Sequence, residues 1–185
     1  MATTKDIAWG TYQQYAGPFF RGTLKHKISN NSDFMEQCLA VLCATEGGCY
    51  DSYNGYDRCV STSGMIQWCE AGQYSVSNML GLVAERCGVD YLLTTLKPAL
   101  DAAGATFKKN SQGKWRFFFL DDRGEVNSLD KQKQLFWNCS GLKDSWTDAN
   151  KIYAKQWAAC IANVWLDPEA RRAQVDFTKP KLMNF

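Results

Sequence analysis

The chain has 185 residues, of which 45% are hydrophobic and 22% charged, and its formal net charge is +2. This length and mixture fit one globular domain spanning residues 1–185, and so small a charge argues against nucleic acid as a partner. No apolar run reaches membrane-spanning length, and residues 1–20 lack the apolar core of a signal peptide, so we expect no membrane insertion. We also expect a monomer; the localisation and any export route stay open.

The first predicted helix begins after Ser32, a residue type common at N-caps. Its apolar positions follow at helical steps of four and three, at Met35, Leu39 and Leu42. Glu46 continues this series by another step of four, which places it in the last turn on the buried face. The glycines at 47–48 then end the helix.

A β-rich segment follows this helix. Residues 49–69 contain few helix formers, and Tyr53–Tyr56 predicts a hairpin with a two-residue turn at Asn54-Gly55. The helical period returns near Ser75 and stops at Gly88. The stripe of this second helix is apolar throughout, at Val76, Met79, Leu80 and Val83.

The second half of the chain is mainly helical in pattern. Leu92 and Leu93 indicate another helix, and Pro98 is expected to open a short one through Ala103. Residues 113–127 predict a second small hairpin, with a strand at 114–120 and a turn at Asp122-Arg123-Gly124.

A long tail helix and a shorter one complete the predicted elements. The long helix has a stripe that steps by four or three, at Ala149, Tyr153, Trp157, Cys160 and Val164, widened by Ile152 and Ile161. Asp167 then caps a further helix that has Pro168 at its first position. The predicted fold class is therefore α+β and mainly α, with a small β-hairpin after the first core helix.

The metal-ligating residue types give little sign of a metal site. The eight cysteines show no C-x-x-C pair, and the single histidine, His26, excludes a two-histidine site within one chain. We expect neither a metal nor another cofactor. Five cysteines fall within residues 38–69, and both a disulfide that pins this segment and a set of buried thiols stay open.

Glu46 is the residue whose position indicates chemistry. Burial disfavours the charged form of a carboxyl group and raises its pKa, and the negative end of a helix acts in the same direction. Such a group can hold a proton near neutral pH and give it to a leaving oxygen as a general acid. The alternative is a glutamate that ends a helix and points to water.

The residues around Glu46 resemble those of the lysozyme-like superfamily. Its lytic transglycosylases and goose-type lysozymes carry a glutamate at the end of a core helix, then a loop, then a Gly-Leu-Met-Gln-like run. Here Glu46 precedes a loop with Ser61-Thr62-Ser63, and Gly64-Met65-Ile66-Gln67 matches the run with two exchanges. Phage-type lysozymes place an aspartate and a threonine on the following hairpin, and Asp57 and Thr62 are similar to these. The resemblance covers residues 33–70.

This resemblance implies cleavage of the β-1,4 bond between N-acetylmuramic acid and N-acetylglucosamine in peptidoglycan strands. Glu46 would be the catalytic acid, with Asp57 and Thr62 as further catalytic candidates and Asp51 as the competing second carboxylate. If a second carboxylate acts beside Glu46, the resemblance implies hydrolysis by water. Without one, the 6-hydroxyl of the muramyl sugar attacks internally, and the product is an anhydro sugar. The substrate-binding candidates are Ser61, Ser63, Gln67, Tyr56 and Tyr153.

Two other classes of protein stay open. One is a non-enzymatic lysozyme-like module that supports structure or binds glycan, and the other is a disulfide-rich secreted binding domain. A cell-wall substrate together with no predicted signal peptide favours a phage endolysin or a virion-associated lysin.

Overall fold

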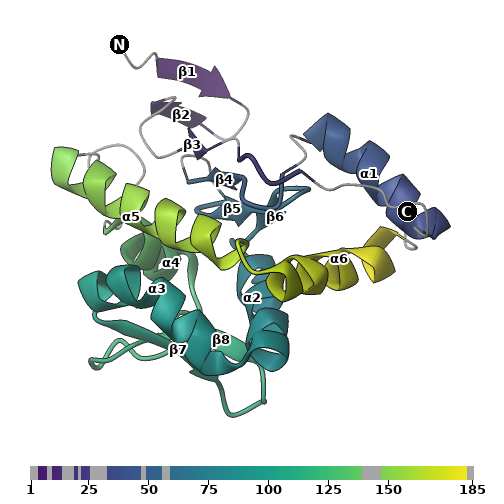
Figure 1. The fold of residues 1–185 in the computed structure, drawn as a ribbon. Helices are drawn as coiled ribbons and strands as arrows, with labels where there is room; N and C mark the ends of the chain where they lie inside the picture. The colour runs from purple at the N-terminus through teal and green to yellow at the C-terminus, as the bar shows by residue number, and fades with distance from the viewer. Residues whose placement is uncertain are drawn as a thin grey trace.

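The structure is a computed structural model of the chain, and it is mainly helical with small antiparallel sheets (Figure 1). It describes residues 4–7, 10–13, 19–20, 22–25, 33–46, 49–55, 59–138 and 147–182. Side chains are described for residues 22–25, 33–44, 49–55, 59–138 and 147–180. The α+β, mainly helical class predicted from the sequence is confirmed.

The described residues form eight strands and six helices. The strands are β1 (Thr4–Ile7), β2 (Gly10–Gln13), β3 (Phe19–Phe20), β4 (Tyr53–Asn54), β5 (Thr62–Ser63), β6 (Trp68–Cys69), β7 (Ala105–Lys109) and β8 (Trp115–Phe119). The helices are α1 (Phe34–Glu46), α2 (Ser75–Cys87), α3 (Val89–Ala103), α4 (Leu129–Trp137), α5 (Asp148–Val164) and α6 (Pro168–Leu182).

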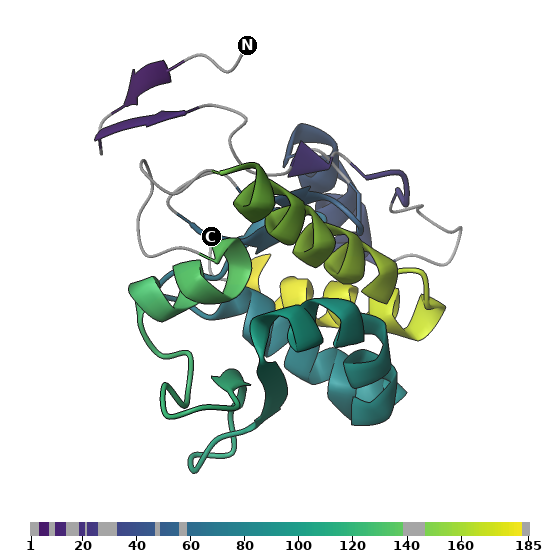
Figure 2. The same cartoon turned by 90° about the vertical axis from the view of Figure 1, so that its left-hand side faces the viewer.

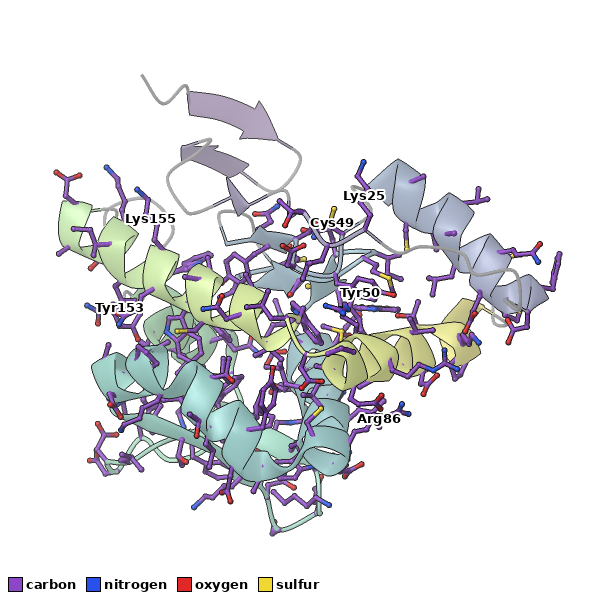
Figure 3. The ribbon with its side chains drawn as sticks, in the orientation of Figure 1. Lys25, Cys49, Tyr50, Arg86, Tyr153 and Lys155 are labelled. Atoms are coloured by element: carbon purple, nitrogen blue, oxygen red, sulfur yellow. The ribbon has the colours of Figure 1, made fainter. Side chains whose placement is uncertain are left out.

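Helix α2 is the centre of the packing. It contacts α3, α6, β6 and β8, and α3 lies along α5 on the side that Figure 2 turns toward the viewer. The four apolar residues of the predicted α2 stripe are all fully buried: Val76, Met79, Leu80 and Val83. Figure 3 shows side chains filling the space between these elements. The helix ends before Gly88, which has a φ of +89°.

The sheet after α1 differs in register from the prediction. Its strand order is β3-β4-β5-β6, with Tyr53 paired to Ser63 and Asn54 paired to Thr62. Asn54 is thus a strand residue, and residues 55–61 connect the strands, so the predicted two-residue Asn-Gly turn is wrong. Tyr53 is fully buried, and this register keeps its large side chain in the core.

The second hairpin has the expected strand but a different partner. Strand β8 pairs with β7, which precedes it, because alternate residues of both strands face the core. Phe107 and Phe117, which are register partners, pack with ring centroids 4.7 Å apart. After the turn that ends at Gly124, only a single bridge joins Phe118 to Glu125.

Two helix predictions were wrong in detail. Pro98 lies inside the single helix α3, whose buried residues continue on both sides of it at Leu96 and Ala99, so packing outweighs the cost of proline. Ile152 is 68% exposed and does not widen the α5 stripe. Asp167 does cap α6, since its Oδ1 accepts a hydrogen bond from Glu169 N at 2.7 Å. Helix α4 was not predicted.

Helix α1 is held against α6 by charge as well as by apolar contact (Figure 1). Its described buried face is formed by Glu36, Leu39 and Cys43, while Met35 and Leu42 are half-buried. The Glu36 carboxylate lies 3.1 Å from Arg172 Nη1 and 2.9 Å from Lys179 Nζ. The buried face is therefore rotated from the predicted one by part of a turn, because these ion pairs draw Glu36 inward.

Candidate functional site

Glu46 is the last residue of helix α1, where the sequence placed it. The described buried face runs through Leu39 and Cys43, and helical steps of three and four from Cys43 lead to positions 46 and 47. The side chain of Glu46 lies outside the described side chains, and Tyr56 and Asp57 lie outside the described residues altogether. The predicted pairing of the two carboxyl groups therefore stays a prediction.

The turn between β5 and β6 is closed from within by Gln67. Its Oε1 accepts a hydrogen bond from Thr62 Oγ1 at 3.1 Å, and its Nε2 donates to Gly64 O at 3.1 Å. Thr62 is buried and Gln67 is half-buried. These two predicted site residues are thus brought together, in contacts that fix the shape of the turn.

Helix α6 clamps the same turn through Gln174, which is fully buried. Gln174 Oε1 accepts from Met65 N at 2.7 Å, and Gln174 Nε2 donates to Tyr50 O at 3.2 Å. Gly64 has a φ of +90°, and a Cβ added there would lie 2.7 Å from Gln174 Oε1. Only glycine meets both conditions at this position.

Gln174 was not among the site residues predicted from the sequence. A polar amide among the apolar residues of a buried helix face was the available signal, since such groups are retained where they satisfy buried backbone atoms. Thr178, one turn further along, plays a similar part by accepting a hydrogen bond from Trp68 Nε1 at 3.2 Å.

Ser61 and Ser63 lie in the interior of the protein. Both are fully buried, and their hydroxyl groups have no hydrogen-bond partner among the described residues. The preceding residue, Val60, has a φ of +63°, which is strained for a β-branched side chain. Its carbonyl accepts a hydrogen bond from Trp137 Nε1 at 2.9 Å. Strain and unpaired hydroxyl groups thus gather at the start of β5, as they often do at functional sites.

Asp51 has a structural role. It is buried, and its Oδ1 accepts hydrogen bonds from Thr23 N at 2.9 Å and Leu24 N at 2.8 Å. These bonds tie the segment at residues 22–25 to the chain that follows α1. Of the two aspartates that the sequence left open as a second carboxylate, Asp51 is thus engaged in backbone hydrogen bonds, and Asp57 lies outside the described residues.

Tyr153 projects from α5 and is half-buried (Figure 3). Its hydroxyl donates a hydrogen bond to Leu135 O at 2.6 Å, which joins α5 to α4. Burial raises the pKa of this hydroxyl, so it stays protonated at neutral pH.

Glu70 is a buried acid that the sequence analysis missed, because the segment around it resembles an ordinary loop. It is 1% exposed, and it accepts hydrogen bonds from Ser77 Oγ at 2.5 Å and Ser77 N at 2.9 Å. Burial raises the pKa of Glu70 to about 7, although the Ser77 bonds and the positive charge of Arg116 act against this shift. The carboxyl group thus caps the start of helix α2 and titrates near neutral pH.

The described cysteines give no support to a metal or thiolate site. Cys38, Cys43, Cys87 and Cys160 are free thiols, so none of these four forms the disulfide considered from the sequence. Burial raises the pKa of Cys43 to about 12, which opposes thiolate chemistry there. Within the described residues, no group of three or more His, Cys, Asp or Glu side chains is placed to hold a metal ion.

Comparison of the chain with family models, with curated proteins and with solved structures finds no match in any of the three. None of the helices in the described part of the chain is both long enough and apolar enough to span a membrane. The functional conclusion therefore depends on the residues and their geometry.

Proposed function

We propose that this chain is a peptidoglycan-cleaving glycosidase with a lysozyme-like fold and with Glu46 as its general acid. The reaction is cleavage of the β-1,4 bond between N-acetylmuramic acid and N-acetylglucosamine. Glu46 gives its proton to the glycosidic oxygen, and Asp57 is the candidate for activating water or stabilising the developing positive charge. The substrate is the glycan strand of a bacterial cell wall.

The observation that carries this proposal is the order of elements around Glu46. Helix α1 ends at Glu46, a short antiparallel sheet follows, and the turn at residues 64–67 precedes the central helix α2. Gln174 and Gln67 together hold this turn by hydrogen bonds to Met65 N and Gly64 O. A turn fixed from both sides is the preorganised support that a catalytic site needs.

The contacts of Thr62 and Gln67 favour positioning roles for these residues over direct contact with substrate. Thr62 bonds to Gln67, and Gln67 in turn bonds to the backbone of the turn. Ser61 and Ser63 have unpaired hydroxyl groups, which can bind sugar only if the start of β5 opens to admit it. Their mutation to alanine should then alter KM more than kcat.

A turbidity assay on purified cell walls tests the proposal. Glu46→Gln should leave the fold intact and lower the rate of lysis by roughly 10²–10⁴-fold, the usual contribution of general acid catalysis. Glu169→Gln is the matched control, since Glu169 is an exposed glutamate in the first turn of α6. A Glu46→Gln variant that lyses walls at the rate of the control would refute the assignment.

Two further readouts separate the remaining alternatives. Mass spectrometry of the products distinguishes reducing ends, expected if Asp57 supports hydrolysis, from anhydromuramyl ends, expected if Glu46 works alone. Wall binding without any cleavage would instead identify the non-enzymatic glycan-binding module.

A further inference from the structure

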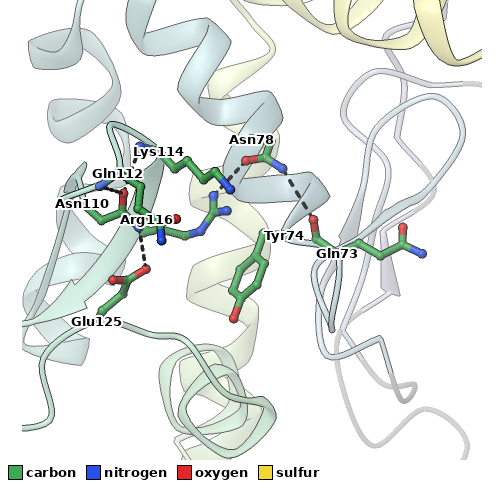
Figure 4. A pocket seen from close by; sticks show the side chains of 8 residues that line it. All are labelled: Gln73, Tyr74, Asn78, Asn110, Gln112, Lys114, Arg116 and Glu125. Carbon is green, nitrogen blue, oxygen red and sulfur yellow. Dashed lines mark hydrogen bonds between the residues drawn. The ribbon is translucent and has the colours of Figure 1, made fainter.

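A polar cavity of about 480 Å³ lies outside the turn at residues 64–67. Its first lining residues, at positions 73–78, follow Glu70 in the sequence, whereas the turn precedes Glu70. It opens between the start of helix α2 and the hairpin β7–β8 (Figure 4). The lining residues are Gln73, Tyr74, Asn78, Asn110, Gln112, Lys114, Arg116 and Glu125. All eight are polar or charged, which indicates a hydrophilic ligand.

Arg116 is the unusual member of this set, because it is a largely buried cation that forms no ion pair with a described carboxylate, although its charge acts on Glu70. It is 7% exposed, and no described carboxylate lies within 4 Å of its guanidinium group. Its Nη1 donates to Asn78 Oδ1 at 2.8 Å and to Trp115 O at 2.6 Å, while Nε and Nη2 have no hydrogen-bond partner among the described residues. These two nitrogen atoms are not among the buried side-chain atoms that lack a hydrogen-bond partner, so they face the solvent in the cavity, where a ligand can reach them.

The guanidinium group is also held in a fixed orientation. It stacks over the ring of Tyr74, with its central carbon 4.4 Å from the ring centroid, and Asn78 anchors one edge (Figure 4). Tyr74 itself has a φ of +53°, an uncommon backbone conformation for a residue other than glycine. The free donors of an oriented guanidinium form a fork that matches a carboxylate group.

A negative charge lines the same cavity without reaching Arg116. Glu125 Oε1 accepts a hydrogen bond from Asn110 Nδ2 at 3.1 Å, and its Oε2 has no described partner. Glu125 follows β8 and is bridged to Phe118, two residues along β8 from Arg116, so the two charged residues are diagonal neighbours across this bridge. Lys114, also two residues from Arg116, adds a second positive charge at the exposed rim.

We propose that this cavity binds a small zwitterionic ligand, either a free amino acid or the end of a short peptide. Arg116, assisted by Lys114, receives the carboxylate through Nε and Nη2, and Glu125 receives the ammonium group. The amide side chains of Asn110, Gln112 and Gln73 surround the polar middle of the ligand. Opposite charges that share a cavity but do not pair leave room for a ligand that bridges them.

Titrations followed by ¹H–¹⁵N NMR of the full chain test this proposal, since they detect millimolar affinities. Glycine and glycylglycine, as free amino acid and peptide, carry both charges, N-acetylglycine lacks the ammonium group and glycinamide lacks the carboxylate. At least one of the two zwitterions should bind to the protein. N-acetylglycine and glycinamide, the blocked probes, should each bind to the protein roughly tenfold more weakly than that zwitterion, or not at all. The better of the two zwitterions identifies the source of the ligand.

Variants assign the two ends of the site. Lys114→Gln and Glu125→Gln should each weaken binding of the preferred zwitterion severalfold, and Arg116→Gln should abolish it. Lys97→Gln is the control, because Lys97 is an exposed lysine paired with Asp101 outside this cavity. Because Lys114 is exposed, its variant keeps the test valid even if Arg116→Gln fails to fold. Absence of binding by both zwitterions, equal binding of the blocked probes, or binding unchanged in Lys114→Gln and Glu125→Gln would overturn the proposal.

Discussion

The buried carboxyl group of Glu70 should make the stability of the protein fall as the pH rises from about 4.5 to about 7. Its pKa is about 7 in the folded chain, against an ordinary value of 4.5. Between these two values the folded state binds more protons than the unfolded state, so raising the pH favours unfolding. The difference of about 2.5 units corresponds to about 3 kcal/mol, since each unit is worth 1.36 kcal/mol.

Glu70→Gln should remove this penalty. The amide has nearly the same shape. Its oxygen can accept the hydrogen bond from Ser77 N, and its NH2 group can donate to Ser77 Oγ, whose hydroxyl group then acts as the acceptor. Below pH 4.5 the variant and the parent chain should be about equally stable. Above pH 7 the variant should be more stable, by up to about 3 kcal/mol.

Urea denaturation at half-unit pH intervals from 4 to 8 measures this effect as the difference between variant and parent. Glu85→Gln is a control with the opposite sign, because hydrogen bonds from Trp115 and Lys109 lower the pKa of the Glu85 carboxyl. Its contribution to stability is present above the ordinary pKa of 4.5 and is lost as the pH falls through the lowered value. A Glu70→Gln difference that is independent of pH from 4 to 8 would refute this account of the buried acid.

Three more substitutions or reactions follow from the geometry around the turn. Gly64→Ala should lower the free energy of unfolding by about 2 kcal/mol or more, because its φ is positive and the new Cβ would meet Gln174; a urea melt that matches the parent contradicts this. Asp51→Ala should cost about 2 kcal/mol by the same assay, since it leaves the amide groups of Thr23 and Leu24 without their acceptor. Cys43 should react with a thiol reagent only when the chain unfolds, because its side chain is buried; rapid labelling of Cys43 in native buffer, located by peptide mass mapping, would contradict this.

The helices could be predicted where their apolar period is strong and local. The α2 stripe is fully buried as expected, and the Asp167-Pro168 start of α6 is found where the sequence placed it. Both depend on residues within a few turns of one another, which a single sequence displays. Pro98 misled the prediction because its local cost is outweighed by packing on both sides of it, which the pattern alone does not reveal.

The parts that could not be predicted depend on contacts distant in sequence. The partner of β8 was misassigned because either neighbouring segment could supply a strand, and the burial of Phe107 decides between them. Glu70 was missed because it stands in no recognisable pattern, and Gln174 because the backbone groups that it binds, Met65 N and Tyr50 O, lie 109 and 124 residues away. The end of helix α1 at Glu46, by contrast, is marked locally by the glycines that follow it.

The clamp between α6 and the turn also constrains the order in which the protein can be completed during synthesis. The bond from Met65 N to Gln174 joins residues 109 positions apart, and the bond from Trp68 to Thr178 joins residues 110 apart. At usual ribosomal rates of about 5–20 residues per second, the turn waits several seconds for the helix that fixes it. A nascent chain stalled before residue 174 would therefore contain α1 and β4–β6, but the turn at residues 64–67 would lack its hydrogen bonds to α6. We expect this form to be the most accessible to proteases and chaperones.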